Sequence, residues 1–409
     1  MRILVVSQWF PPEPGGGPAR FLEMAKVWLD LGHDVQVIAG MPNWPTGRIH
    51  DDYRRRLSVR ERYDGVPVVR TPVLRTRNEG AMRRLANHGS FVLSGSVAGL
   101  RTAGRPDVVI ATSPPLFAPL AGLLVARRHR IPFVLDVRDL WPDAIFALSD
   151  MDSRPVRGGL QYLERMLYRR SSAVVVVTEG FAQPVRDRGA ARVETIPNGV
   201  DLETFAPGPP DPSVRRNLGS DNELILLYAG TLGLAHGLDT VLEAARRLAG
   251  TRARFVFAGE GADRPRLEEL AAAMGLGNVT FLPLQPRERM PDLYRAADVC
   301  LASLRPAELF NVTIPSKIFE IMGSGRPIVA AVDGEAADIV RRSGAGVVAK
   351  PGSVEALEGS VRTFLDSPDL DRMGAAGRRF VEGAFDRRAL AIRYESLIAE
   401  LAVGTTPSI

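Results

Sequence analysis

The sequence contains little cysteine and little lysine. Its 409 residues include one cysteine, Cys300, and only three of its 52 basic residues are lysines, Lys26, Lys317 and Lys350. A single thiol cannot form an internal disulfide, and this fits a cytoplasmic protein. Cys300 lies in an apolar run, so we expect it in a buried strand.

Long hydrophobic runs are also missing. The longest, Leu116–Ala126, contains a proline and is far shorter than the ~20 residues that a membrane-spanning helix needs. The segment Met1–Ser7 is too short for a secretory signal and is typical of a first β-strand. We therefore expect a cytoplasmic protein without spanning helices, for which peripheral binding to the inner face of the plasma membrane remains open.

Common nucleotide and metal motifs are absent. Gly15-Gly16-Gly17 is followed by Arg20 where a Gly-x-Gly-x-x-Gly fingerprint needs its third glycine, and no lysine follows a glycine as in a Walker loop. The five histidines have no metal-ligand spacing. These absences argue against a dinucleotide-dependent dehydrogenase and a P-loop enzyme, and we predict no metal site.

Charge is divided unequally along the chain. Residues 1–200 carry 28 basic and 19 acidic side chains, net +9, whereas residues 201–409 carry 24 and 28, net −4. The composition, 45% apolar and 24% charged, is ordinary for a globular chain of two or three domains. The basic half predicts an anionic partner there: a phosphate group, a nucleic acid or a membrane surface.

Short apolar runs alternate with longer amphipathic stretches in both halves, a pattern typical of parallel sheets covered by helices on both faces. The first half has expected strands at 3–6, 35–39, 108–111, 133–135 and 174–177, and expected helices at 20–31, 82–100, 115–130 and 156–171. The second has expected strands at 224–228, 254–258, 279–282, 299–302 and 327–330, expected helices at 238–248, 266–274, 290–297, 316–322 and 336–342, and closing helices at 354–365, 372–383 and 388–401.

Two local signals complete this α/β pattern. Residues 57–63 and 66–70, joined by Asp64-Gly65, predict a hairpin inserted in the first half. Four prolines between Phe205 and Pro212 predict a linker. Two α/β units in tandem would form a cleft, with the site built from strand-to-helix loops of both.

Gly15-Gly16-Gly17 lies between the first expected strand and the helix expected from Arg20. Glycines let a backbone approach a ligand closely at a helix N-terminus, and the first strand-to-helix loop of such a sheet is a usual binding site. A plain tight turn is the alternative.

The segment Thr313–Glu320 predicts an anion site at the start of a helix. Pro315 suits the first helical position, and Ser316 and Lys317 would follow in the first turn, where free N–H groups and the helix dipole attract anions. A lysine there is locally unfavourable by about 0.3–1 kcal/mol, so in a lysine-poor chain it indicates a phosphate contact. Glu320, one turn later, could accept bonds from sugar hydroxyls. A surface lysine–glutamate pair is the alternative.

Polar side chains also follow the strand expected at 133–135. Asp136, Arg138, Asp139, Trp141 and Asp143 would form a catalytic edge at the carboxyl end of that strand. A salt-bridged, capped loop is the alternative.

A set of segments spread over nearly the whole chain resembles a known family. They are Gly15–Arg20, Gly32–Val35, Ile196–Asp201, Tyr228–Thr231, Phe257–Gly261, Asn278–Leu282, Ala297-Asp298 and Glu320–Pro327. In this combination the chain resembles glycosyltransferase family 4, retaining enzymes of the GT-B fold. Segments 42–47, 139–143 and 315–320 further resemble the bacterial branch that includes fucosamine-type transferases of O-antigen and capsule assembly.

The resemblance implies an α/β fold of the GT-B type, with two doubly wound Rossmann-like domains facing across a cleft and a C-terminal helix crossing back to the N-terminal domain. The expected domains are an acceptor-binding domain, residues 1–203 with helix 386–409 packed on it, and a nucleotide-sugar-binding domain, residues 204–385. The implied reaction is a retaining, metal-independent transfer of a hexosyl or N-acetylhexosaminyl group from a nucleotide donor, with UDP the expected nucleotide, in surface polysaccharide or related glycoconjugate assembly.

Family roles carry over onto matching residues. Glu320 matches the glutamate that holds the ribose, Phe281 and Leu282 match the segment that meets the base, and Gly16 and Gly17 match the loop facing the diphosphate and sugar. The complete expected site comprises catalytic residues Arg138, Asp139 and Lys317; donor residues Gly16, Gly17, Gly230, Thr231, His236, Gly261, Phe281, Leu282, Pro315, Ser316, Lys317 and Glu320; and acceptor residues Asn43, Trp44 and Trp141.

The chain departs from the family pattern in three features, which involve four positions. Val312 stands where many members have a second glutamate, and Arg138 stands where many have a histidine before the aspartate. Thr231 and His236 occupy the positions where an arginine and a lysine commonly clamp the diphosphate. We therefore expect Lys317, with Thr231 and His236, to replace that clamp.

The expected mechanism follows from the leaving group. Helix N–H groups and Lys317 would stabilise the charge on the departing nucleoside diphosphate. The resemblance implies front-face attack, with the donor phosphate taking the acceptor proton and no enzymic nucleophile. Arg138 and Asp139 would orient the acceptor and the sugar.

Arginine clusters predict a membrane surface and a lipid-pyrophosphate-linked acceptor. They lie at residues 54–56, 75 and 77, 83–84 and 127–130, and two of them flank the apolar stretches Phe91–Leu100 and Leu116–Ala126. Basic rims around apolar helices suit an anionic bilayer. Core helices with solvated arginines, and a soluble small-molecule acceptor, are the alternatives.

Other function classes are less well matched. A nucleotide-sugar 2-epimerase shares the two-unit architecture, but the five scattered histidines do not suggest its acid–base set. A non-catalytic nucleotide-sugar binder stays open because the clamp is altered. A nucleic-acid binder would need aromatic residues interleaved with the basic clusters, and these are missing.

Overall fold

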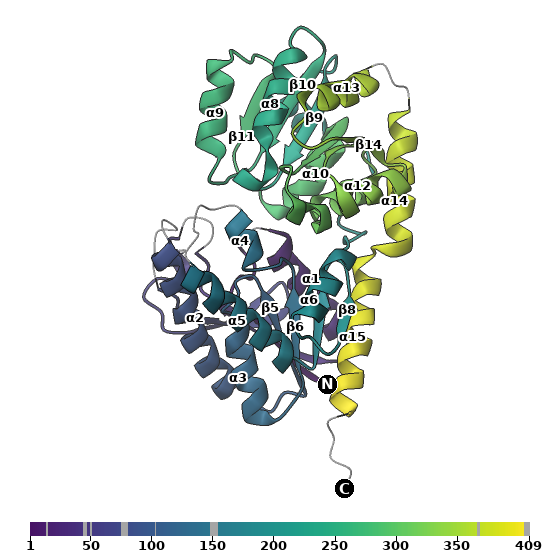
Figure 1. Cartoon of the computed structure of the whole chain (residues 1–409). Helices are drawn as coiled ribbons and strands as arrows, with labels where there is room; N and C mark the ends of the chain where they lie inside the picture. Colours follow the sequence, from purple (N-terminus) through teal and green to yellow (C-terminus); the bar gives the residue numbers. More distant parts are fainter. Residues whose placement is uncertain are drawn as a thin grey trace. The chain divides into compact units, whose positions relative to one another are not determined.

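The computed structural model describes residues 1–13, 15–43, 47–49, 51–74, 81–102, 104–147, 154–365 and 369–404. The chain divides into two compact units. The first contains Met1–Asn198 together with the chain from Arg388 onward, and the second is Gly199–Arg387. Figure 1 shows a sheet flanked by helices in each unit.

In the described part of the first unit, eight strands form one sheet in the order β3-β4-β2-β1-β5-β6-β7-β8. They are β1 (Arg2–Ser7), β2 (Asp34–Gly40), β3 (Val59–Tyr63), β4 (Val66–Thr71), β5 (Val108–Ser113), β6 (Phe133–Val137), β7 (Ala173–Val176) and β8 (Val193–Thr195). All neighbours are parallel except β3 and β4, so the predicted hairpin is confirmed. Buried central strands such as β5 explain the unbroken apolar runs.

Helices cover both faces of this sheet. They are α1 (Gly16–Asp30), α2 (Ala81–Thr102), α3 (Pro119–His129), α4 (Asp143–Ala147), α5 (Arg154–Arg170), α6 (Glu179–Asp187) and the last helix of the chain, α15 (Arg387–Val403), with the short 3-10 helix η1 (Asp51–Tyr53). Ile3 and Val5 share a core with α1 and α15, whereas Leu4, between them, lies on the side of α2. Because successive side chains of a strand point to opposite faces of the sheet, α1 and α15 lie on one face and α2 lies on the other.

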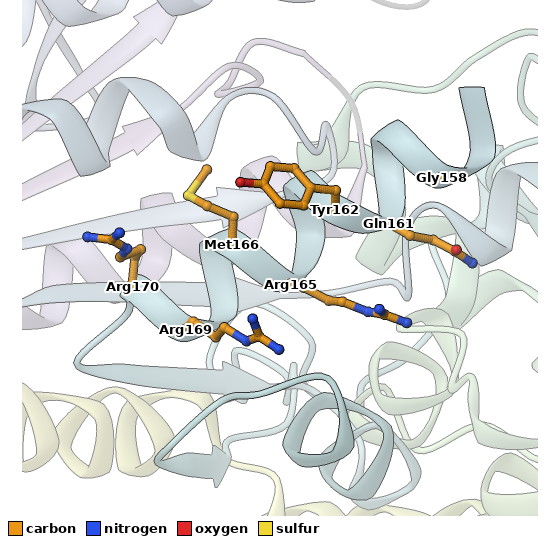
Figure 2. Close-up of a pocket in the computed structure, with 7 residues that line it drawn as sticks. All are labelled: Gly158, Gln161, Tyr162, Arg165, Met166, Arg169 and Arg170. Atoms are coloured by element: carbon orange, nitrogen blue, oxygen red, sulfur yellow. The ribbon is translucent and has the colours of Figure 1, made fainter. Parts of the chain in front are cut away.

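The helices α2, α3 and α5 are neighbours on their face. The outer side of α5 carries a groove of about 390 Å³ (Figure 2). Its described lining comes from α5 alone: Gly158, Gln161, Tyr162, Arg165, Met166, Arg169 and Arg170.

Two predicted helix starts differ from the structure by four residues. α1 begins at Gly16 rather than at Arg20, because Gly15 adopts a φ of 121° and turns the chain directly into the helix. α3 begins at Pro119 rather than at residue 115. In both cases a proline lies in the first turn, a position that it tolerates because its missing N–H would have no partner there.

In the described part of the second unit, six parallel strands are ordered β11-β10-β9-β12-β13-β14. The strands are β9 (Leu224–Ala229), β10 (Ala253–Ala258), β11 (Val279–Leu282), β12 (Val299–Ser303), β13 (Ile328–Ala331) and β14 (Gly346–Ala349). The helices are α7 (Pro212–Leu218), η2 (Leu234–His236), α8 (Leu238–Arg247), α9 (Arg264–Ala273), η3 (Arg287–Arg289), α10 (Met290–Ala296), η4 (Glu308–Val312), α11 (Lys317–Gly323), α12 (Gly334–Ser343), α13 (Val354–Leu365) and α14 (Leu370–Ala384).

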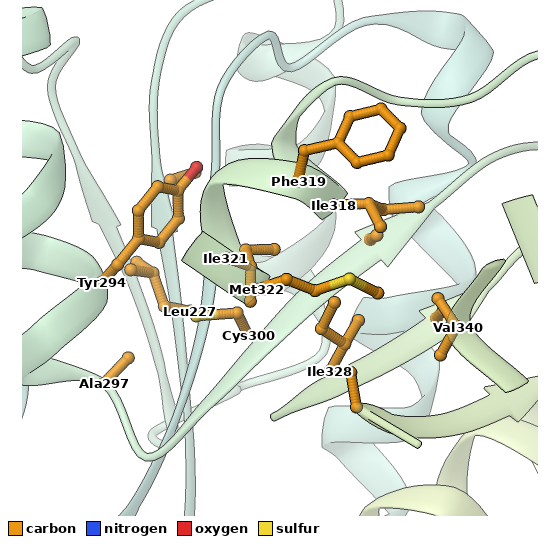
Figure 3. Close-up of a cluster of buried hydrophobic side chains, with 14 of the residues drawn as sticks. Leu227, Tyr294, Ala297, Cys300, Ile318, Phe319, Ile321, Met322, Ile328 and Val340 are labelled. Carbon is orange, nitrogen blue, oxygen red and sulfur yellow. The ribbon is translucent and has the colours of Figure 1, made fainter. Parts of the chain in front are cut away.

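One core of the second unit fixes α11 against the sheet. Ile318, Ile321 and Met322 point into an apolar cluster that contains Cys300 of β12 and Ile328 of β13 (Figure 3). The prediction that Cys300 lies in a buried strand is confirmed. Because α11 is anchored by this core, its first residue, Lys317, is held at the edge of the sheet.

The predicted linker, 205–212, lies inside the second unit. Phe205 is fully buried in the core of that unit, and Val200 forms an isolated bridge with Asp386. Asp211 caps α7 by accepting bonds from the backbone of Ser213 and Val214. The four prolines are exposed, and they therefore lie in a surface segment of the second unit rather than in a linker between domains.

The last helix completes the first unit. The indole Nε1 of Trp28 donates to the carbonyl of Ala391 at 2.9 Å, and the ring of Trp28 packs edge-on against Tyr394. Both side chains are fully buried. The predicted packing of the C-terminal helix on the first α/β unit is therefore present.

Candidate active site

The first unit has its topological switch point between β1 and β5, where the strand order reverses. The Arg138 guanidinium lies there, because its Nε donates to Thr112 Oγ1 of β5 at 2.9 Å and its Nη2 donates to the carbonyl of Pro114 at 3.2 Å. A Cβ on Gly17 would lie 1.2 Å from Nη1 of Arg138. Arg138 thus rests directly on the glycine loop, and the structure brings Gly16, Gly17 and Arg138 together.

Asp139 differs from the other carboxylates of its loop. Asp136 pairs with Arg20, and Asp143 pairs with Arg188, so the salt-bridged alternative holds for these two. Burial raises the pKa of Asp139 to about 6 from 3.8, and the charge of Arg138 opposes that rise. A half-buried carboxyl with a raised pKa next to an arginine is a candidate for a catalytic or binding role.

The expected acceptor residues are placed differently. Asn43 is buried, and its backbone N–H donates to Glu13 Oε1 at 3.0 Å. Trp141 is half-buried in the segment that follows Asp139. Trp44 lies outside the described residues.

The second unit has its switch point between β9 and β12. Here the Lys317 ammonium lies 3.5 Å from the centre of the Tyr228 ring, and Nζ is shielded from solvent without a hydrogen-bond partner among the described residues. Burial lowers the pKa of Lys317 to about 7, against the smaller opposing effect of Glu320. The alternative of a surface lysine–glutamate pair is thus wrong. A Cβ on Gly230 would come within 3.2 Å of Nζ, so Gly230 keeps this space open.

His236 lies beside Lys317 but adds no charge. Its Nδ1 bonds to the carbonyl of Ser303 at 3.2 Å, so the proton is on Nδ1 and Nε2 is an acceptor. Burial, and then the charge of Lys317, lowers the pKa of His236 to about 3. The neutral ring adds no cation beside Lys317 in the free protein, and the contribution of His236 to a diphosphate clamp stays a prediction.

The remaining donor residues line the same carboxyl edge. Thr231 is exposed directly after Gly230, and its carbonyl accepts from the Tyr228 hydroxyl at 2.8 Å. Gly261 lies against the carbonyl of Leu232, where a Cβ would come within 2.2 Å.

Glu320 is buried one turn after Lys317 and already has two partners. Oε1 accepts from Arg287 at 3.2 Å, and Oε2 accepts from the Tyr294 hydroxyl at 3.3 Å. These bonds hold the carboxylate in a fixed orientation while its remaining lone pairs can still accept from hydroxyl groups. Arg287 was not predicted, since nothing in its local sequence marks it.

Phe281 and Leu282 end β11. The Phe281 ring stacks on Phe257 with ring centroids 5.1 Å apart. Phe257 is buried, and Phe281 is half-buried. The Leu282 carbonyl accepts from Arg264 Nη1 at 2.9 Å, a contact that also escaped prediction.

Pro315 and Ser316 precede α11 instead of forming its first turn. The helix begins at Lys317, and the Ser316 side chain makes no capping bond. The Pro315 carbonyl accepts from the Ile318 N–H at 3.0 Å. Lys317 therefore takes the position that the sequence predicted for Pro315.

Within the described residues, no group of three or more histidine, cysteine, aspartate and glutamate side chains is arranged to hold a metal ion. No helix in the described part of the chain combines the length and the apolar character needed to cross a membrane.

Two family models match the chain. A glycosyl transferase 4-like domain matches residues 15–199, and the glycosyl transferases group 1 model matches residues 211–380. The chain belongs to the family 4 glycosyltransferases. The matched ranges fall on the first and second α/β units, and they contain Arg138 and Lys317 respectively.

Curated relatives are glycosyltransferases by name. WcaI of Escherichia coli K12, named for colanic acid biosynthesis, is 28% identical over 402 residues, covering 95% of this chain and 97% of its own. D-inositol 3-phosphate glycosyltransferase 1 of Catenulispora acidiphila is 29% identical, with coverage of 90% and 88%. A GDP-mannose-dependent phosphatidylinositol dimannoside mannosyltransferase of Mycobacterium tuberculosis is 32% identical over 235 residues, with coverage of 56% and 58%.

Solved glycosyltransferase structures show the same fold. Sucrose-phosphate synthase of Thermosynechococcus elongatus superposes with a TM-score of 0.76 at 18% identity, covering 98% of this chain and 99% of its own. HepE of Anabaena, in complex with UDP and glucose, superposes with a TM-score of 0.73 at 18% identity, covering 98% and 100%. The predicted GT-B fold is confirmed.

Proposed function

We propose that this glycosyltransferase moves a hexosyl or N-acetylhexosaminyl group from a UDP-linked donor to an acceptor hydroxyl, with retention of the anomeric configuration. It would act in the cytoplasm at the inner face of the plasma membrane, on a lipid-pyrophosphate-linked saccharide of surface polysaccharide or related glycoconjugate assembly. The observation that carries the proposal is the buried ammonium of Lys317 at the switch point of the second unit, which has no hydrogen-bond partner among the described residues.

Lys317 has the properties of a site for a diphosphate. Burial without a hydrogen-bond partner makes the protonated amine unfavourable, as its lowered pKa shows. An anionic diphosphate would supply that partner, and the charge that develops on the leaving group strengthens the contact as the glycosidic bond breaks. Gly230 leaves the approach to Nζ free of a side chain.

Other residues of the second unit would hold the nucleoside. Glu320, oriented by Arg287 and Tyr294, would accept hydrogen bonds from the ribose hydroxyls. Phe281 and Leu282, at the end of β11, would meet the base. Thr231, Gly261, Pro315 and Ser316 line the same carboxyl edge of the sheet and would complete the donor site.

The first unit would supply the acceptor side. Arg138, fixed on Gly17 and Thr112, would orient the sugar and acceptor through its remaining N–H groups. Asp139 would accept a hydrogen bond from an acceptor hydroxyl, while the donor phosphate takes the proton in a front-face attack. Asn43, Trp44 and Trp141 are the proposed acceptor contacts. No residue is assigned as a nucleophile.

GDP-mannose is the second candidate donor. The mycobacterial relative that is 32% identical over 235 residues is named a GDP-mannose-dependent enzyme, whereas HepE of Anabaena was solved with UDP. Both nucleotides carry the diphosphate that Lys317 would bind. Contacts to the base would therefore decide whether the protein prefers UDP or GDP.

Calorimetric titration of UDP and GDP, both in EDTA, tests the donor. We expect saturable UDP binding without metal, and a Lys317→Met variant with affinity lower by about 2–4 kcal/mol for loss of a charge-assisted contact. Lys350→Met is the matched control, because Lys350 is an exposed lysine of the same unit. Equal UDP affinity of the two variants would overturn the role of Lys317. Tighter binding of GDP than of UDP would make a GDP-linked sugar the proposed donor.

Product analysis tests the reaction. Incubation with a panel of UDP-sugars and lipid-linked acceptors should give an α- or β-linked product whose anomeric configuration, followed by proton NMR, matches that of the donor. Inversion would overturn the retaining mechanism. An epimerised donor without transfer would indicate an epimerase, and nucleotide binding without any product would indicate a binding protein.

A further inference from the structure

The exposed surface of α2, α3 and α5 contains arginine and apolar side chains and no exposed acidic ones. Its exposed arginines are Arg83, Arg101, Arg127, Arg128, Arg154, Arg157, Arg165, Arg169 and Arg170. The only acidic residue within the three helices is Glu164. Glu164 is buried and accepts from Arg188 at 2.6 Å, so it does not neutralise the outer surface.

Several of these arginines keep their charge uncompensated. Arg127, Arg128, Arg165, Arg169 and Arg170 form no ion pair with a residue that the structure describes. Elsewhere on the chain exposed arginines commonly have a carboxylate nearby, as Arg341 does with Asp338 at 3.0 Å. A surface that leaves its arginines unpaired attracts an anionic partner.

Apolar side chains are exposed on the same helices. Leu93 is 73% exposed and Val97 is 47% exposed on α2, one turn apart, and Leu100 continues the same stripe at 44%. Leu124 of α3, 48% exposed, lies on the neighbouring helix. Adjacent exposed apolar residues of this kind mark an interaction surface rather than scattered solvent contacts.

The groove on α5 adds an aromatic residue to this surface. Tyr162 is 74% exposed, and it projects from the helix near Met166, while Arg165, Arg169 and Arg170 project around them (Figure 2). Tyrosine and arginine around apolar side chains are suited to the boundary between lipid headgroups and acyl chains.

We propose that the surface formed by α2, α3 and α5 binds an anionic phospholipid bilayer. Uncompensated arginines would meet the lipid phosphates, and Leu93, Val97, Leu100 and Leu124 would enter the boundary of the acyl chains. This inference deepens the proposed function, because it assigns a membrane surface to the enzyme proposed to act on a lipid-linked acceptor.

The composition of the surface favours a bilayer over a nucleic acid. Single-stranded nucleic acids are bound by aromatic side chains on which bases stack, and Tyr162 is the only exposed aromatic residue described on these three helices. A row of leucine and valine side chains offers no hydrogen bond to a base or sugar, but it is the feature expected of a face that enters lipid.

Sedimentation of the full chain with vesicles tests the proposal. We expect binding to phosphatidylcholine vesicles that contain phosphatidylglycerol, and none to pure phosphatidylcholine. Arg127→Gln/Arg128→Gln should weaken binding by about 25-fold, since each basic residue near the surface contributes about fivefold. Leu93→Ser/Val97→Ser should retain binding at low salt and lose it at physiological salt.

Arg341→Gln/Arg342→Gln is the matched control. These two exposed arginines lie in the last turn of α12, as Arg127 and Arg128 lie in the last turn of α3, and the change in net charge is the same. An equal loss of vesicle binding in the control would overturn the proposal, as would no sedimentation of the unmodified chain at low salt. Arginine-dependent binding of RNA without vesicle binding would overturn it too. UDP titration of the same variants is independent of vesicles, so failure here leaves the proposed transfer reaction separately testable.

Discussion

The guanidinium of Arg20 and the carboxylate of Asp136 form an ion pair that solvent does not reach. Nη2 and Oδ2 are 3.2 Å apart, and both side chains are fully buried. Arg20 also donates to the carbonyls of Ile196 at 2.9 Å and Pro197 at 2.5 Å. A single side chain of α1 thus joins β6 to the segment through which the chain leaves the first unit.

Replacing Arg20 should destabilise the first unit strongly. Arg20→Met leaves Asp136 buried without its partner, and we expect the free energy of unfolding to fall by about 3–5 kcal/mol in urea denaturation. Arg341→Met is the control, because it breaks an exposed pair with Asp338 and should change stability by less than about 1 kcal/mol. Equal effects of the two changes would contradict the role of burial.

Lys317 should make donor affinity depend on pH. In the free protein its pKa is about 7 instead of 10.5, and an anionic diphosphate favours the protonated form. Affinity for UDP-glucose, measured by calorimetry, should therefore fall as the pH rises from about 6 to about 8.5, by up to tenfold per unit. Lys317→Arg keeps its charge and should remove this dependence.

The same shift has a consequence for stability. Between about pH 7 and 10 the unfolded chain keeps a proton on Lys317 that the folded chain has lost, so this residue makes the free energy of unfolding rise with pH. Below about pH 7 both states are protonated and the slope vanishes. Lys317→Met should therefore flatten the wild-type profile in the alkaline window, and an unchanged profile would contradict the lowered pKa.

Gly17→Ala should impair activity by displacing Arg138. The new Cβ would overlap the guanidinium, whose flexible side chain can move away without unfolding the protein. We expect kcat/KM to fall at least about tenfold with little change in thermal stability. Gly359→Ala is the control, because a Cβ at this helical glycine of α13 meets no atom within 4 Å.

Asp139 should appear in the pH profile of the reaction. Its folded pKa of about 6 lies above the ordinary 3.8, so between about pH 4 and 6 the folded chain holds a proton that the unfolded chain lacks. For this residue the free energy of unfolding falls as the pH rises through that window. If its carboxylate accepts a hydrogen bond from the acceptor hydroxyl, kcat/KM for the acceptor should rise with pH through about pH 6. This rise should be missing in Asp139→Asn.

Unbroken apolar runs predicted the architecture well. The bounds of β11 and α13 agree with the sequence pattern, because one is a short β-branched run and the other has strong helical periodicity. β8 and β14 were not predicted, since they are only three and four residues long and partly exposed. Such edge strands owe their conformation to pairing with a neighbour rather than to their own sequence.

The site was predictable only in part. Lys317 stands out because the chain has so few lysines, and the structure places its ammonium over the Tyr228 ring, without a hydrogen-bond partner among the described residues. The neutral state of His236 depends on the carbonyl of Ser303, 67 residues away, and the partner of Arg20 is 116 residues away. Contacts over such separations leave no local signal in a single sequence.

The assignment of α15 to the first unit bears on how the protein is synthesised. The ribosome completes β1 to β8 long before it makes the residues that accept the Trp28 indole and pack on its ring. During that interval α15 is missing from the face that it shares with α1, so the part of this face that α15 later covers has no helix over it. The nascent first unit is therefore completed only after the whole second unit has been synthesised.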